Sequence, residues 1–156
     1  KGVKLEGVQG VRYLYHDPCH TPMKQQDAIK TVNALVTTAD ATPVLKSERC
    51  CGESGTLGVS RPDISTQVRF RKTEELRKGE AALRASAGLP ATANLKILTS
   101  CPSCLQGLHR YEGDLANGLL EADYVVIEMA RHILGEDWLE AYVAQANAGG
   151  IERVLV

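Results

Sequence analysis

Short extended segments alternate with helical segments along this chain, and this alternation most restricts the folds that it can adopt. β-branched and aromatic residues over 11–16 predict a strand, and 42–46 and 94–99 are further strand candidates. Apolar residues at helical spacing predict a helix over 27–36, with Asp27 as its N-cap. Strands that alternate with helices are typical of βαβ units. The sequence therefore predicts a three-layer α/β fold, in which helices flank a mostly parallel, Rossmann-like sheet.

The segment between the second and third strands is long and rich in helix-forming residues. It covers 62–87, and within it Glu80 and Arg84 are spaced for an i,i+4 ion pair. Gly79 lies inside this segment, and we expect it to divide the segment into two helices. Gly88 is typical of the residue at which the second helix ends.

The last third of the chain contains helix signals and two uncertain strand signals. A helix is predicted over 103–111, because proline is favoured near a helix start. Residues 124–127 read either as a fourth strand or as the start of a helix that continues to 134. The apolar stripe over 138–143 predicts an amphipathic helix that packs on the core, and 151–156 is a candidate last strand.

All five cysteines follow predicted strands. Cys19 comes after the first strand, Cys50 and Cys51 come after the second, and Cys101 and Cys104 come after the third. The carboxyl ends of parallel strands meet at one edge of a sheet, which is where ligand sites collect. We therefore expect all five thiols to converge on that edge.

Metal binding is the chemistry that best fits this group of thiols. A chain of 156 residues buries a core without disulfides, and an odd number of cysteines cannot pair completely within it. Soft sulfur ligands select iron–sulfur clusters, zinc or copper(I). Two alternatives remain: ordinary buried cysteines, or a redox pair of Cys101 and Cys104 that leaves the other three without a role.

Two histidines and an arginine lie beside these cysteines in the sequence. His16 and His20 flank Cys19, and each is a candidate zinc ligand, proton donor or hydrogen-bond partner of a ligand. Arg49 precedes Cys50 and is a candidate to offset the negative charge of thiolates. An ordinary structural role explains each of the three equally well.

Charge and composition exclude several classes of function. The chain has 18 basic and 19 acidic side chains, a net charge of −1, one Phe and one Trp, which gives no basis for nucleic-acid binding. It contains neither a run of 18 apolar residues nor the hydrophobic segment of a signal peptide. We expect a cytoplasmic protein that is not transmembrane and that reaches the inner face of a membrane only through partners.

Three cysteine motifs of this chain resemble those of the cysteine-rich CCG domain. In chain order they are His16-Asp17-Pro18-Cys19-His20, then Cys50-Cys51-Gly52, then Ser100-Cys101-Pro102-Ser103-Cys104. That domain occurs in heterodisulfide reductase, in the iron–sulfur subunit of glycolate oxidase, in lactate-utilisation proteins and behind FAD-linked oxidases of the D-lactate dehydrogenase type. The resemblance covers about residues 13–111 and is greatest to the C-terminal end of the FAD-linked fusions.

The resemblance implies a ligand set, a cofactor and partners. It implies that an iron–sulfur cluster is bound by Cys19, Cys50, Cys51, Cys101 and Cys104. In heterodisulfide reductase this cluster is a non-cubane [4Fe–4S] cluster, and in some relatives zinc replaces it. The implied function is electron transfer in an FAD-linked 2-hydroxyacid dehydrogenase that acts on D-lactate or glycolate. FAD would belong to a partner domain or subunit, and a quinone or cytochrome would take the electrons onward. The chain alone is not expected to turn over substrate.

A structural zinc-binding α/β interaction module without redox activity is the alternative function. The number of ligands separates the two hypotheses, because structural zinc is almost always four-coordinate and leaves one cysteine over. A multi-iron cluster can use all five cysteines.

One domain is expected over residues 1–156. The chain starts at Lys1 and ends on an apolar run, which suggests the C-terminal piece of a longer protein. The interval from Cys51 to Cys101 is longer than is usual for the family, with the extra length around 74–90, and we expect this insertion to leave the cysteine edge intact. Many relatives carry two CCG motifs where this chain has one, and no glycine-rich flavin fingerprint is present.

Overall fold

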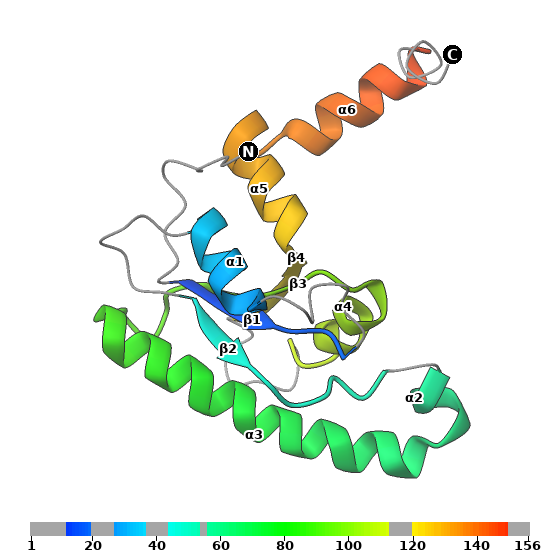
Figure 1. The fold of residues 1–156 in the computed structure, drawn as a ribbon. Helices are drawn as coiled ribbons and strands as arrows, with labels where there is room; N and C mark the ends of the chain where they lie inside the picture. The colour runs from blue at the N-terminus through cyan, green and yellow to red at the C-terminus, as the bar shows by residue number, and fades with distance from the viewer. Residues whose placement is uncertain (1–11, 20–26, 37–43, 54–55, 113–119, 150–156) are drawn as a thin grey trace.

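A sheet of four parallel strands forms the centre of the computed structural model (Figure 1). The strand order is β2-β1-β3-β4, and each neighbouring pair is parallel, which confirms the predicted α/β class. The strands are β1 (Tyr13–His16), β2 (Leu45–Ser47), β3 (Leu95–Thr99) and β4 (Leu120–Tyr124). The structure describes residues 12–19, 27–36, 44–53, 56–112 and 120–149.

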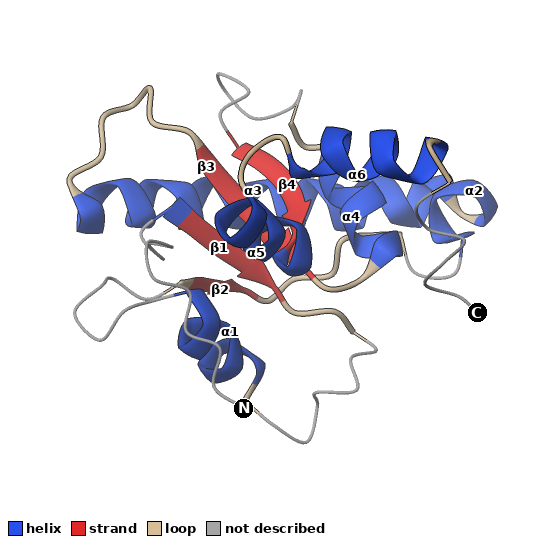
Figure 2. Cartoon of the chain, turned by 90° about the horizontal axis from the view of Figure 1, so that it is seen from above, coloured by secondary structure: helices blue, strands red, loops and turns tan. Residues whose placement is uncertain are grey.

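Helices cover both faces of the sheet and complete three layers (Figures 1 and 2). The helices α1 and α5 pack on one face, and α3 and α4 pack on the other. Successive side chains of a strand point to opposite faces. Tyr13 and Tyr15 therefore pack against α1 and α5, and Leu14 packs on the face that α3 and α4 cover. The helices are α1 (Ala28–Val36), α2 (Leu57–Ser60), α3 (Pro62–Ala87), α4 (Pro102–His109), α5 (Val125–Leu134) and α6 (Trp138–Asn147).

Local sequence signals locate several element boundaries. Asp27 caps α1 as predicted, since its Oδ1 accepts a hydrogen bond from the backbone N–H of Lys30 at 3.2 Å. Residues 124–127 contain both a strand end and a helix start, because β4 ends at Tyr124 and α5 begins at Val125. Strand β2 is shorter than predicted and begins at Leu45.

Gly79 does not divide α3, so the prediction of two helices over 62–87 is wrong. The helix continues through this residue to Ala87 and ends at Gly88, which adopts a left-handed conformation. A Cβ atom on Gly79 would lie 3.3 Å from both terminal methyl groups of Leu14 in β1. The glycine therefore lets α3 approach the sheet closely rather than breaking the helix.

Helix α6 forms where an amphipathic helix was predicted, but its apolar stripe does not pack on the core. None of its residues is buried among the described part of the chain, and Leu139, Tyr142 and Val143 are each about half exposed. Figure 1 shows α6 projecting away from the sheet. The candidate strand over 151–156 lies outside the described residues.

Within the described residues, no helix is both long enough and apolar enough to span a lipid bilayer.

Candidate metal centre

The strand order places the topological switch point of the sheet at the carboxyl ends of β1 and β3. The chain moves from β1 to β2 on one side and then returns to β3 on the other side of β1. Loops that leave neighbouring strands in opposite directions open a crevice where α/β proteins bind ligands. His16 ends β1 at this point, and Cys101 directly precedes α4 after β3.

Three buried donors meet at this switch point. One ligand atom from each of His16, Cys51 and Cys104 lies within 4.8 Å of the other two, and the two sulfur atoms are 3.5 Å apart. A tetrahedral metal with bonds of about 2.3 Å to sulfur separates two thiolate ligands by about 3.8 Å. The spacing and the soft donors therefore fit a metal.

The other three cysteines continue this group toward the surface. Cys19 is exposed, and its thiol helps to raise the pKa of the half-buried Cys50. Cys101 is half-buried and acts in the same way on Cys104. The structure thus brings together all five cysteines from three strand ends, and their assignment as ligands stays a prediction.

Hydrogen bonds leave one buried thiol prepared for ionisation. The hydrogen bond between Cys51 and Cys104 is the largest cause. Together with the nearby His16 side chain and the backbone of Glu53, it outweighs desolvation and lowers the pKa of Cys51 to about 4. The same contact raises the pKa of Cys104, because only one of two adjacent thiols ionises readily. Burial raises the pKa of Cys50. Metal ligands must be deprotonated, so the Cys51 thiolate is an available first ligand.

The start of α4 sets the position of the two sulfurs of the C-x-x-C motif. Pro102 occupies the first turn of the helix, and the carbonyl of Cys101 accepts the backbone N–H of Leu105 at 2.9 Å. Cys101 and Cys104 consequently lie at the positive end of α4, where anionic sulfur is favoured.

The loop that carries Cys50 and Cys51 is held from both sides. Gly52 has φ +84°, a left-handed conformation that favours glycine, and its N–H donates to Cys50 Sγ at 3.4 Å. Ser65 of α3 donates to the Gly52 carbonyl at 3.1 Å, and the Tyr111 hydroxyl donates to the Cys51 carbonyl at 3.3 Å. These contacts fix the backbone on which the two thiols stand.

Glu53 links this loop to α4. Its carboxylate is buried and forms an ion pair with Arg110, so the two charges compensate each other. The Glu53 side chain crosses α4 over Gly107, where a Cβ would lie 2.5 Å from Glu53 Cγ. Only glycine leaves room for this crossing.

A buried lysine and a glutamate of α3 support the cysteine centre, and neither was predicted from the sequence. Lys72 is fully buried, and its Nζ donates to Glu75 Oε2 at 2.8 Å, donates to Ser47 Oγ, and lies 3.3 Å from His16 Nδ1. Burial lowers the pKa of Lys72, while Glu75 opposes that change. Cys50 and Cys51 also act on Lys72 electrostatically, so it is a buried cation beside the thiols.

Glu75 extends the support to the second cysteine segment. Its carboxylate accepts the backbone N–H of Glu48 at 2.7 Å and that of Arg49 at 3.0 Å, just before Cys50. Helix α3 therefore contributes to the cysteine edge. One feature of the sequence indicated that Lys72 is buried. It lies on the same helical stripe as Leu76, Gly79 and Leu83, where an apolar residue is expected.

The three predicted neighbours of the cysteines have different positions. His16 is fully buried within the centre. Arg49 is exposed, and its backbone N–H donates to Glu75. His20 lies outside the described residues.

Two buried polar atoms at the end of β1 have no hydrogen-bond partner in the described part of the chain. They are His16 Nε2 and Asp17 Oδ1. A buried polar atom without a partner is unfavourable, so such an atom next to thiols indicates that a further group completes the site. The donor set fits a metal, and the two atoms without a partner show that the site has room for a further hydrogen-bonding group.

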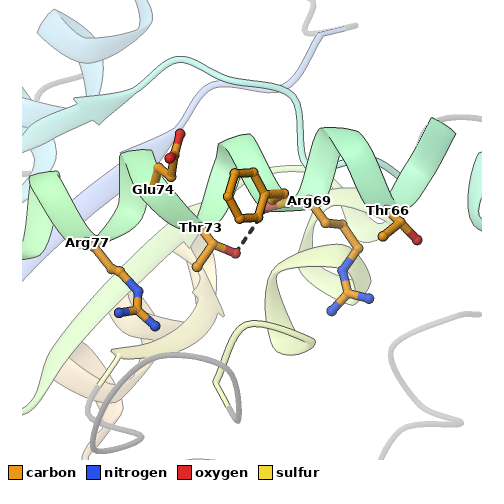
Figure 3. A pocket seen from close by; sticks show the side chains of 6 residues that line it. Thr66, Arg69, Thr73, Glu74 and Arg77 are labelled. Carbon is orange, nitrogen blue, oxygen red and sulfur yellow. Dashed lines mark hydrogen bonds between the residues drawn. The ribbon is translucent and has the colours of Figure 1, made fainter. Parts of the chain in front are cut away.

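A cavity of about 550 Å³ lies elsewhere, along α3 (Figure 3). None of the cysteines lines it in the described part of the chain. Its described lining residues all belong to α3: Thr66, Arg69, Phe70, Thr73, Glu74 and Arg77.

Comparison with known families divides the chain near residue 109. The model of the cysteine-rich domain CCG matches residues 13–109, a range that contains all five cysteines and the first three strands. A domain of unknown function, DUF3400, matches residues 109–156. Searches of curated proteins and of solved structures gave no significant match.

Proposed function

This chain belongs to the cysteine-rich CCG domain family, and on that premise we propose that it binds an iron–sulfur cluster and serves as an electron-transfer domain. Family membership supports a metal-binding, electron-transfer type of role, and the group of His16, Cys51 and Cys104 supports a metal site. The observation that carries the proposal is the buried pair of sulfur atoms 3.5 Å apart, with a further cysteine beside each of them.

The number of thiols favours a multi-iron cluster over a single ion. The residues that would hold it are Cys19, Cys50, Cys51, Cys101 and Cys104, a set that suits the non-cubane type of [4Fe–4S] cluster. When bound, such a cluster supplies one-electron transfer. Cys19 is exposed, so one side of the centre faces solvent, where an electron donor can approach.

The proposed setting is an FAD-linked 2-hydroxyacid dehydrogenase. Oxidation of D-lactate or glycolate to the 2-oxo acid removes two electrons and two protons, which the FAD of a partner domain or subunit takes up. Reduced FAD then gives the electrons away one at a time and releases its protons to water. This chain lies between that FAD and either a quinone, which accepts both electrons, or a cytochrome, of which two haems accept one electron each. Because flavin chemistry resides in the partner, the chain alone does not turn over substrate.

We also propose that the chain forms one structural domain. Strand β4 belongs to the region matched by DUF3400, and it pairs with β3 of the CCG region over 95–99 and 120–124. A sheet that crosses the boundary between the two matched regions supports a single folding unit.

A structural zinc module is the second candidate, and one observation favours it. The three buried donors His16, Cys51 and Cys104 are spaced for a single ion, which would need one further ligand from the other cysteines. In that case the centre stabilises the fold and transfers no electrons.

Metal analysis of protein prepared without oxygen tests the proposal. We expect several irons and several acid-labile sulfides per chain, visible absorbance, and an electron paramagnetic resonance signal after one-electron reduction. Cys51→Ser should lose most of the iron and colour, because Cys51 is the thiol of the buried pair whose pKa is lowered. Ser103→Ala is the matched control in the same cysteine-rich stretch and should keep both. One zinc per chain with no visible absorbance would contradict the cluster and support the zinc module.

A further inference from the structure

Lys72 uses all three hydrogen-bond directions of its ammonium group within the buried region. Its partners are Glu75 Oε2 at 2.8 Å, Ser47 Oγ, and His16 Nδ1 at 3.3 Å. The side chain is fully buried, and the adjacent Glu75 carboxylate favours the charged form. An ammonium group can donate hydrogen bonds but cannot accept them.

This contact decides which nitrogen of His16 carries the proton. Because Lys72 donates to Nδ1, Nδ1 must be an acceptor, and the proton of the neutral ring lies on Nε2. Nε2 is buried and has no hydrogen-bond partner among the described residues, while Cys51 and Cys104 lie next to the ring. The ring nitrogen that has no partner among the described residues is therefore a donor.

We propose that His16 donates an Nε2–H hydrogen bond to sulfur at the cysteine centre, that it is not a metal ligand, and that Lys72 is the positioning residue that fixes this tautomer. The proposal rests on the proposed function in one respect, namely that the cysteines bind a metal cluster. A histidine that binds metal through Nε2 carries its proton on Nδ1 and needs an acceptor there. Lys72 occupies that place as a donor.

The arrangement has a consequence for a redox centre. Hydrogen bonds to the sulfur atoms of an iron–sulfur cluster, and the charges around it, set its reduction potential. The Nε2–H group and the buried Lys72 cation both favour the reduced cluster, because reduction adds negative charge. Their removal should make the midpoint potential more negative without removing the metal.

Variants of His16 separate a hydrogen-bond donor from a ligand. In His16→Gln the side-chain amide can place an N–H near the position of Nε2, whereas His16→Leu has no donor. We expect the iron content per chain of both variants to equal that of the wild type, and the midpoint potential of His16→Leu alone to become clearly more negative. Loss of iron from both variants would overturn the proposal, since it would show that His16 is a ligand.

Pulsed electron paramagnetic resonance on the reduced, ¹⁵N-histidine-labelled protein gives a direct readout. A hydrogen-bonded ring produces weak nitrogen coupling, and a bound ring produces strong coupling. We expect weak coupling that disappears in His16→Leu. Strong coupling in the wild type contradicts the proposal.

Lys72→Met tests the positioning role and has a matched control. Lys96→Met removes a lysine that also pairs with a buried glutamate, Glu128, but at the amino end of β3. We expect Lys72→Met to keep its iron and to show a midpoint potential shifted to a more negative value, while Lys96→Met keeps the wild-type potential. Equal potentials in all three proteins would show that Lys72 does not act on the centre.

These outcomes remain distinct from failure of the proposed function. Wild-type protein without iron and sulfide would contradict the electron-transfer role itself. If that protein binds zinc instead, X-ray absorption at the zinc edge tests the same ligand assignment. A shell of sulfur alone at about 2.3 Å supports the donor role of His16, and a nitrogen at about 2.0 Å overturns it.

Discussion

Two buried lysine–glutamate pairs stand at opposite ends of the central strands. Lys72 and Glu75 meet the carboxyl end of β1 at His16. Lys96 and Glu128 lie at the amino ends of β1 and β3, 2.9 Å apart. The chain therefore buries similar charges twice, in two different surroundings.

At the amino end, both carboxylate oxygens of Glu128 have hydrogen-bond partners. The Glu128 carboxylate accepts the Tyr13 hydroxyl and the Lys96 ammonium group, and it also accepts Arg131 at 3.2 Å. At the carboxyl end, His16 keeps one ring nitrogen without a partner in the described part of the chain. A complete network serves to hold α5 on the sheet, whereas an incomplete one beside thiols belongs to a site that takes a further group.

The largest expected effect distinguishes the two pairs by stability. Glu75→Ala leaves the fully buried Lys72 without a carboxylate, and loss of one partner of a buried pair costs about 3–5 kcal/mol. Glu128→Ala should cost less, because the side chains of Lys96 and Arg131 are 20% and 30% exposed and can reach water. Urea unfolding of the reduced, metal-free protein measures both. An equal loss of unfolding free energy in the two variants would contradict the expected difference between the pairs.

A smaller effect is expected from packing at the cysteine end. Gly107→Ala places a methyl group against Glu53 and should destabilise the protein by about 1–3 kcal/mol, as overpacking does. It should also weaken metal retention, because Glu53 follows the loop of Cys50 and Cys51. Gly79→Ala is the control in α3: its new methyl group would lie 3.3 Å from the methyl groups of Leu14, against 2.5 Å from Glu53 for Gly107→Ala, and alanine improves helix propensity by about 1 kcal/mol, which offsets the tight contact. If Gly107→Ala were as mild as this control, the crossing of Glu53 over α4 would not be tight.

The smallest expected effect is the response of the amino end to acid. Burial tends to raise the pKa of Glu128, but hydrogen bonds from Tyr13 and Lys96 outweigh it and leave the pKa below the ordinary value of 4.5. A carboxylate of this kind adds stability above its unfolded pKa, and the contribution disappears as the pH falls through the lower folded pKa. We expect the unfolding free energy of the wild type to fall below about pH 4.5 more steeply than that of Glu128→Gln. Parallel curves would contradict the coupling.

The fold class and the meeting of the cysteines could be predicted because both depend on local pattern. Alternating strand and helix signals fix a parallel sheet, and the position of each cysteine after a strand fixes the edge to which it belongs. Lys72 could not be assigned in this way, since its role arises only when α3 approaches β1 and β2. Gly79 was misread for the same reason: a glycine inside a helix breaks it or permits close approach, and only the position of Leu14 decides between them.

Helix α6 was predicted from the sequence, but its packing was not. A stripe of apolar residues over 138–143 predicts a helix, and the helix is present. The same stripe does not reveal whether the helix packs on the sheet of this chain. Leu139 and Tyr142 remain about half exposed on α6.

Residues from 16 to 104 must be brought together before the cysteine centre exists. Between its three segments, the chain closes two long loops, the first through α1 and β2 and the second through α3 and β3. The entropy of closing such loops is lost when the sheet forms, so the unfolded chain holds no preassembled set of five donors. Folding therefore comes before metal capture, and a metal held there links three strand ends that are remote in sequence. Metal retention is thus a sensitive measure of how intact the whole sheet is.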